Sequence, residues 1–142
     1  MNTAYFKIHG DIHSGNCLKV KYTADRLGLA YEWVAVDVVK GGAKTAQFLA
    51  LNPQGQVPCV EFADGRVLAQ SNAIIRYLAL GSPLLPDDAW AQAKIDEWLF
   101  WEQYSHEPYV AVQRIGRDRW YTHHKTRVAK VERTYSGPEG RG

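Results

Sequence analysis

The sequence has little cysteine and no long hydrophobic run. Cys17 and Cys59 are the only cysteines among 142 residues, too few for a disulfide framework or a cysteine-rich zinc site. No stretch of 18 apolar residues occurs, so we expect no membrane-spanning helix. Residues 1–11 lack the charged-then-apolar pattern of a secretory signal. These absences favour a cytoplasmic protein that does not act at a membrane.

Charge of the two signs nearly balances over the whole chain but not at its end. Residues 113–142 contain eight Lys or Arg against three Asp or Glu, whereas the whole chain has 17 against 15. No recognisable nucleic-acid-binding module accompanies these basic residues, so we expect no nucleic-acid partner. His123 and His124 are adjacent and would point in different directions on a helix, so we expect no metal site. The last residues are expected to be disordered.

The remaining composition is that of an ordinary soluble domain, 46% hydrophobic and 23% charged. The periodicity of apolar residues and the turn residues predict the order βαβαββα over residues 1–81. Strands are expected at 5–8, 31–36, 58–62 and 67–69, and helices at 14–27, 45–51 and 71–80. A helix between the first two strands favours parallel pairing, and Asp64-Gly65 favours an antiparallel hairpin. This arrangement predicts an α/β thioredoxin-like domain.

A different pattern follows from residue 82 onward. Residues 82–86 are expected to form a linker, 87–142 a partial all-helical domain, and 40–44 a flexible segment. Asp87 or Asp88 can cap the new helix. Its aromatic residues cover more than one face, which predicts burial on two sides, and Pro108 is expected to kink or end it.

Three short motifs occur in order along the chain. They are Ser14-Gly15-Asn16-Cys17-Leu18-Lys19-Val20, Asn52-Pro53-x-Gly55-x-Val57-Pro58 and Gln70-Ser71-x-Ala73-Ile74. Together with residues 93–99, they resemble a glutathione S-transferase, most closely its theta-like bacterial members, over residues 4–112. The resemblance implies glutathione as co-substrate, a small electrophile as second substrate, and a homodimer.

Ser14 is the catalytic candidate that the resemblance implies. At the N-terminus of the first helix, its hydroxyl can donate to a thiolate, and the helix dipole favours negative charge there. Donors at helix N-termini lower thiol pKa values, which would keep glutathione as the nucleophilic thiolate. The alternative is that Ser14 is only a helix cap.

The other motif residues are expected to hold the rest of the glutathione molecule. By the resemblance, Val57 precedes a cis proline, Pro58, and pairs through its backbone with the cysteinyl unit, as one strand pairs with another. Gln70 and Ser71 would hold the γ-glutamyl end, although much of the family has Glu where Gln70 stands. The remaining contacts are expected from Asn16, Lys44 and Gln56; the alternatives are that Asn16 only stabilises the turn and that Lys44 is solvated.

Two other functions remain open from the sequence. Cys17 could exchange thiols with glutathione, although a cysteine one turn into a helix is more often a buried apolar residue. Cys59 is expected in the core. Alternatively, the chain is a non-catalytic interaction module. Because apolar periodicity is lost and the charge reverses near residue 113, we expect a truncated or frameshifted product with an incomplete electrophile pocket.

Overall fold

The computed structural model describes residues 5–109, and the expectations for residues 113–142 lie outside this range. The elements are β1 (Phe6–Gly10), α1 (Gly15–Arg26), β2 (Tyr31–Ala35), the 3₁₀ helix η1 (Gly42–Lys44), α2 (Ala46–Leu51), β3 (Cys59–Phe62), β4 (Val67–Ala69), α3 (Ser71–Leu78), α4 (Ala89–Trp101) and the π-helical turn η2 (Glu102–His106). The predicted βαβαββα order and the thioredoxin-like α/β fold are confirmed.

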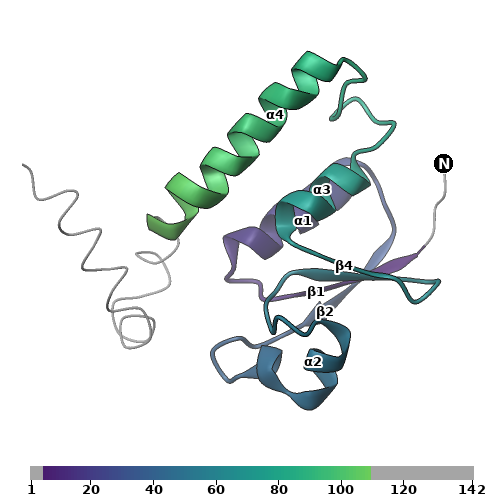
Figure 1. The fold of residues 1–142 in the computed structure, drawn as a ribbon. Helices are drawn as coiled ribbons and strands as arrows, with labels where there is room; N and C mark the ends of the chain where they lie inside the picture. The colour runs from purple at the N-terminus through teal and green to yellow at the C-terminus, as the bar shows by residue number, and fades with distance from the viewer. Residues whose placement is uncertain (1–4, 110–142) are drawn as a thin grey trace, which may run out of the picture. The chain divides into compact units, whose positions relative to one another are not determined.

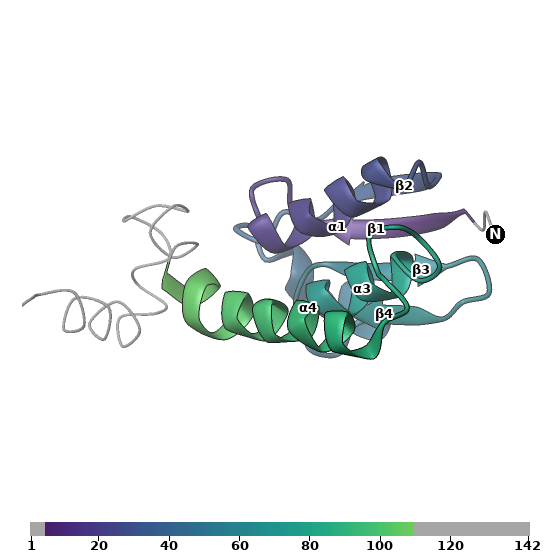
Figure 2. The same cartoon turned by 90° about the horizontal axis from the view of Figure 1, so that it is seen from above.

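The strands form one mixed sheet in the order β2-β1-β3-β4. The β1 strand pairs in parallel with β2 and antiparallel with β3, and β3 pairs antiparallel with β4. As Figures 1 and 2 show, α1 and α3 lie side by side on one face of the sheet, and α2 lies on the other. The βαβ unit therefore gives parallel pairing and the hairpin antiparallel pairing, as predicted.

The α1 helix forms because its apolar residues repeat at helical spacing and both of its ends are capped. Cys17, Val20 and Ala24 are buried along one face. At the C-terminus, Gly28 has φ +63°. Its N–H donates to Asp25 O, and the Leu29 N–H donates to Ala24 O. These two bonds form a Schellman motif, which requires the left-handed residue that glycine supplies.

Two apolar clusters cover the two faces of the sheet. The larger one lies between the sheet and the α1–α3 pair, and the smaller lies on the α2 side. The larger cluster consists of Phe6, Ile8, Val20, Ala24, Val60 and Ile74. The smaller consists of Val36, Ala43, Phe48 and Cys59, so the prediction that Cys59 is a core residue is confirmed.

The chain divides into two compact units, Met1–Gln92 and Ala93–Gly142. Asp88 caps α4 as predicted, because its Oδ2 accepts from the Ala91 N–H at 2.7 Å. The proposed limits 1–81, 82–86 and 87–142 stay a prediction. Among the described residues, no helix is both long and apolar enough to cross a bilayer.

The structure bears on three local predictions. Residues 40–44 are not flexible throughout, because Gly42 to Lys44 form η1, in which the Lys44 N–H donates to Gly41 O at 2.8 Å. Pro108 does not end the helical segment before it, because residues 107–109 are still helical; the chain widens into the π-turn η2 instead. In the single chain no residue of α4 is buried, and the predicted burial on two sides, which includes contact with another subunit, stays a prediction.

Candidate active site

The turn between β1 and α1 carries Ser14. This residue is the N-cap of α1, with extended backbone (φ −86°, ψ 120°). Its Oγ accepts from the Cys17 N–H at a long N···O distance of 3.4 Å. A hydroxyl that accepts one bond still has a proton to give; the Ser14 side chain also hydrogen-bonds Cys17, which lowers the pKa of that thiol, and the hydroxyl can rotate toward a ligand. Ser14 therefore is a helix cap, and its O–H can also donate to a ligand.

Cys17 lies less than one turn further along α1 and has the opposite character. Its side chain has no exposed surface, and its Sγ accepts from the Asp11 N–H at 3.4 Å. Burial raises the pKa of this thiol. Hydrogen bonds from the Ser14 side chain and the Asp11 backbone N–H lower the pKa, but by a smaller amount. A buried thiol that stays protonated is a poor nucleophile. The geometry thus argues against thiol exchange at Cys17.

The first turns of α1 and α3 are joined by a side-chain hydrogen bond. The Ser71 hydroxyl, which is almost fully buried, donates to Asn16 Oδ1 at 3.0 Å. Two helix N-termini with free N–H groups thus converge, an arrangement that favours an anionic ligand. The preceding residue, Gln70, has φ +70°, an unusual value for a residue other than glycine.

The turn between α2 and β3 carries the second group of predicted residues. The Val57-Pro58 peptide bond is cis, as the resemblance implied. Within the described residues, the backbone N–H and C=O of Val57 enter no hydrogen bond. The turn is held by Asn52, a buried residue whose Nδ2 donates to Gln56 O at 2.8 Å. Both polar groups of Val57 can therefore pair with an extended peptide ligand.

Two side-chain contacts link the remaining residues to this turn. Lys44 Nζ donates to Gly55 O at 2.8 Å, so the ammonium group is tied to the turn that precedes Val57. Gln70 Nε2 donates to Gln54 Oε1 at 3.1 Å, which connects the α3 end to the same turn. Hydrogen bonds thus connect the segments that carry the predicted residues into two linked groups, one around α1 and α3 and one around residues 44–58.

Sequence reasoning missed two residues that organise this region. Asn52 is the first residue of the second motif, and its buried amide closes the turn there because its Oδ1 also accepts from the Gln54 N–H at 3.2 Å. No motif of the sequence includes Asp11, yet its side chain accepts from the backbone of two separate segments. For Asn52, the sequence pattern of an Asn followed by Pro and Gly favours a turn that the Asn side chain closes. The long-range contact of Asp11 leaves no signal in a single sequence.

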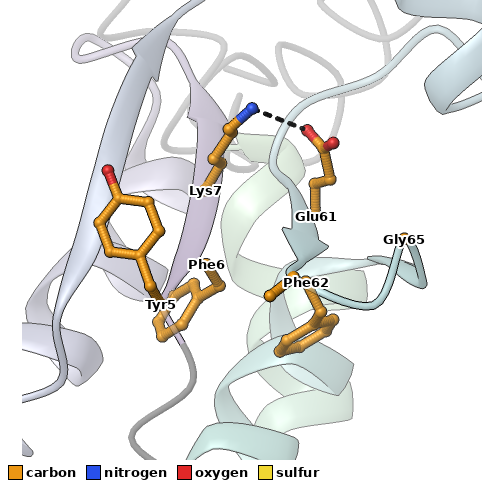
Figure 3. Close-up of a pocket in the computed structure, with 7 residues that line it drawn as sticks. Tyr5, Phe6, Lys7, Glu61, Phe62 and Gly65 are labelled. Carbon is orange, nitrogen blue, oxygen red and sulfur yellow. Dashed lines mark ion pairs between the residues drawn. The ribbon is translucent and has the colours of Figure 1, made fainter.

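A separate pocket lies at the other end of β1 from Ser14. Figure 3 shows its lining, and its volume is about 200 Å³. It is lined by Tyr5, Phe6, Lys7, Glu61, Phe62, Ala63 and Gly65. Lys7 Nζ and Glu61 Oε2 are 3.9 Å apart there. None of the predicted site residues lines this pocket, so it is distinct from the candidate site.

The described residues contain no group of three or more His, Cys, Asp or Glu side chains that could hold a metal ion. The charges near the site come instead from Lys44, from the Asp11 carboxylate and from the partial positive charge at the helix N-termini. This chemistry suits an anionic, peptide-like ligand.

The fold and the site define a thioredoxin-like protein with a serine at the N-terminus of its first helix and a cis proline before its third strand. The family model described as the N-terminal domain of glutathione S-transferase matches residues 13–80. The solved structure of a glutathione S-transferase from Pseudomonas fluorescens is 41% identical, with a TM-score of 0.75, and the match covers 91% of this chain and 69% of that one. This chain belongs to the glutathione S-transferase family.

Two further relatives show how much of a family member the chain represents. A glutathione S-transferase from Xanthobacter autotrophicus is 42% identical with a TM-score of 0.79, over 90% of this chain and 63% of that one. Glutathione S-transferase 3 from Zea mays is 40% identical over 110 residues, 74% of this chain and 49% of that protein. The chain thus spans about half the length of this curated relative.

Proposed function

We propose that the chain binds reduced glutathione and transfers its thiolate to a small electrophilic molecule. The observation that carries this proposal is the place of Ser14: it caps the N-terminus of α1, it is partly exposed, and its hydroxyl can turn toward a ligand. A glutathione sulfur placed there would receive the hydroxyl proton in a hydrogen bond and feel the positive end of α1. Both interactions favour the thiolate over the thiol.

The other predicted residues receive roles that match their geometry. Val57, whose backbone polar groups are unpaired within the described residues, would bind the cysteinyl unit, with cis Pro58 holding it in place. Gln70 and Ser71, at the start of α3, would hold the γ-glutamyl carboxylate and amine. Lys44 would contact the glycyl carboxylate. The supporting contacts would come from Asn16, which binds Ser71, and from Gln56.

In this mechanism the chain supplies binding and one proton-donating contact. The thiolate attacks the electrophilic atom, a carbon–sulfur bond forms, and the leaving group departs with the displaced electron pair. Binding of the thiol must release its proton to solvent, because Ser14 donates a hydrogen bond and accepts no proton. The bound glutathione in the solved structure of a Drosophila mojavensis homologue, which is 28% identical, supports this ligand.

Calorimetric titration of reduced glutathione tests the proposal. Wild type and Ser14→Ala are compared at several pH values near neutrality. Wild type should release a proton on binding, and the alanine variant should bind with little release, because it keeps the pocket but lacks the donor. If Ser14 lowers the pKa of bound glutathione by two units, its removal costs about 2.7 kcal/mol of the free energy that favours the thiolate over the thiol.

Absence of binding at millimolar glutathione, or proton release that survives in Ser14→Ala, would contradict the proposal. The first outcome would favour the interaction module. Cys17→Ala is the matched control, because thiol exchange requires Cys17 and transfer does not. The theta-like subtype and the homodimer belong to the same proposal and are tested by the whole protein's electrophile preference and sedimentation.

A further inference from the structure

Asp11 lies at the start of the turn that carries Ser14, and each of its polar groups takes part in a hydrogen bond. Its N–H donates to Cys17 Sγ at 3.4 Å, and its C=O accepts from the Ser14 N–H at 3.0 Å. Its Oδ1 accepts from the His13 N–H at 2.8 Å. Its Oδ2 accepts from the Val38 N–H at 3.2 Å, 27 residues away in the sequence.

The Val38 contact lies just beyond the end of the sheet. The β1–β2 ladder ends near Gly10, whose C=O accepts from the Val36 N–H at 2.9 Å. After this point the chain turns toward α1, and backbone pairing with the β2 side stops. Beyond the ladder, the Asp11 carboxylate joins the loop after β1 to the loop after β2 by accepting from the Val38 N–H. This hydrogen bond is charge-assisted and therefore stronger than a neutral one.

From Val38 the hydrogen bonds continue to the other side of the proposed site. Val38 O accepts from the Gly41 N–H at 3.1 Å, and Gly41 O accepts from the Lys44 N–H at 2.8 Å. Lys44 Nζ in turn donates to Gly55 O at 2.8 Å. One aspartate is therefore connected, through successive bonds, to the loop that carries Lys44 and to the turn that precedes Val57.

The chemistry of the position requires a carboxylate. An amide in the same place has one acceptor oxygen and would turn its NH₂ group toward the second backbone N–H. A negative charge close to a thiolate is unfavourable in itself. A carboxylate stands beside Ser14 because both of its oxygens are needed as hydrogen-bond acceptors.

We propose that Asp11 is a positioning residue for the glutathione site, fixing the Ser14 turn relative to the loop that leads to Lys44. The inference rests on the proposed function and adds a residue that the motifs do not include. Asp11 does not contact the reacting atoms. It acts by setting where the Ser14 hydroxyl lies relative to a sulfur bound by the other loops.

A positioning role and a purely electrostatic role of Asp11 predict opposite changes in the pKa of bound glutathione when the Asp11 charge is removed. Loss of the negative charge alone would stabilise a nearby thiolate and lower the pKa of bound glutathione. Displacement of the Ser14 hydroxyl would weaken its hydrogen bond to the thiolate and raise that pKa. The Asp11 variants leave the other ionisable side chains of the Ser14 turn, the first turn of α1 and residues 36–44 unchanged. These side chains are His13, Cys17, Asp37, Lys40 and Lys44. The start of α3 carries the neutral Gln70 and Ser71.

The experiment compares Asp11→Asn and Asp11→Ala with wild type. Reduced glutathione is titrated by calorimetry over a range of pH, and amide hydrogen exchange of Val38 and Lys44 is followed without ligand. Asp64→Ala is the matched control, because Asp64 makes a similar bond to the Arg66 N–H (3.0 Å) at the tip of the β3–β4 hairpin.

We expect Asp11→Asn to bind glutathione about tenfold more weakly, the effect of one lost charge-assisted bond. Its proton release should move to higher pH, and the exchange of both amides should become faster. Asp64→Ala should bind as wild type does. If Asp11→Ala does not fold, Asp11→Asn, which keeps the shape of the side chain, carries the test.

Two results would overturn the inference while leaving the proposed function in place. One is a proton release that stays at the wild-type pH or moves lower. The other is unchanged exchange of the Val38 and Lys44 amides in Asp11→Asn. A wild-type chain that binds no glutathione would instead overturn the proposed function, and the inference with it.

Discussion

Ser14 and Cys17 show how one helical turn separates two kinds of chemistry. Ser14 precedes α1 and is partly exposed, so its hydroxyl can meet a ligand. Cys17 lies inside the first turn and faces the sheet, where burial raises the pKa of its thiol. At this scale, burial rather than residue type decides which group can react.

The Cys59 thiol should make the protein less stable at alkaline pH. Burial is the main cause that raises its pKa from 9.0 to about 12, followed by the negative charge of Glu61. The unfolded chain therefore loses this proton at a lower pH than the folded one. The stabilisation is complete below about pH 9 and is lost as pH rises toward 12, by about 1.4 kcal/mol per unit.

Urea unfolding at increasing pH checks this prediction. Other groups also titrate in this range, so the slope of the free energy of unfolding is compared between wild type and Cys59→Ala. The variant should be less stable at neutral pH because it leaves a cavity, but its stability should fall less steeply above pH 9. Parallel slopes for the two proteins would rule out this role of Cys59.

Gln70 should carry backbone strain that glycine would relieve. Its φ of +70° is disfavoured for any residue with a Cβ. Gln70→Gly and Gln70→Ala both lose the hydrogen bond to Gln54 Oε1, so their difference isolates the backbone. We expect the glycine variant to be more stable by about 1 kcal/mol. Chemical denaturation measures this, and equal stabilities would show that no strain is stored there.

Among the elements, the turn between α2 and β3 should depend on the amide of Asn52. Its Nδ2 donates to Gln56 O, and its Oδ1 accepts from the Gln54 N–H. Asn52→Asp replaces the donor with a second oxygen that faces a carbonyl. We expect a loss of about 2 kcal/mol in the free energy of unfolding and weaker glutathione binding, because Val57 follows this turn.

Asn72→Asp is the matched control for this substitution. Asn72 Oδ1 accepts from Lys19 Nζ at 2.7 Å, so a carboxylate there keeps its acceptor and faces a cation. Urea unfolding and glutathione titration of both variants give the comparison. Equal losses in the two proteins would mean that any new charge disturbs the domain and that Asn52 has no special role in the turn.

The sequence predicted local features better than contacts between distant segments. Apolar spacing and capping residues located the helices, and Asp64-Gly65 located the hairpin, because these signals lie within a few residues. The glycines of residues 40–44 predict a flexible segment, yet the Gly42 N–H donates to Asp37 O at 2.7 Å and fixes the segment. The Ser71–Asn16 bond joins residues 55 apart, and no local pattern encodes it.

For the molecule as a whole, the division into two units places the predicted site residues in one unit and the exposed Trp98 and Phe100 in the other. Every predicted site residue lies in Met1–Gln92, which includes the 13–80 segment matched by the family model. The chain spans 49% of its Zea mays relative. Glutathione binding can therefore be tested on this unit's residues, whereas the electrophile pocket is a question for the whole protein.

The aromatic residues of α4 should drive association between copies of the chain. Trp98 and Phe100 have 62% and 73% of their surface exposed, and no residue of α4 is buried. Burial of one such side chain in an interface contributes about 1.5–3 kcal/mol. We therefore expect concentration-dependent self-association in sedimentation velocity, weakened at least about tenfold by Phe100→Gln.

Tyr22→Gln provides the comparison for this experiment, because Tyr22 is 60% exposed on α1, in the other unit. If the loss of any exposed aromatic side chain weakened association, Phe100→Gln and Tyr22→Gln would weaken it equally. Weakening by Phe100→Gln alone would place the interface on α4, because only there does the substitution remove buried apolar area. A wild-type chain that sediments as a monomer at every concentration would show that α4 remains exposed in solution.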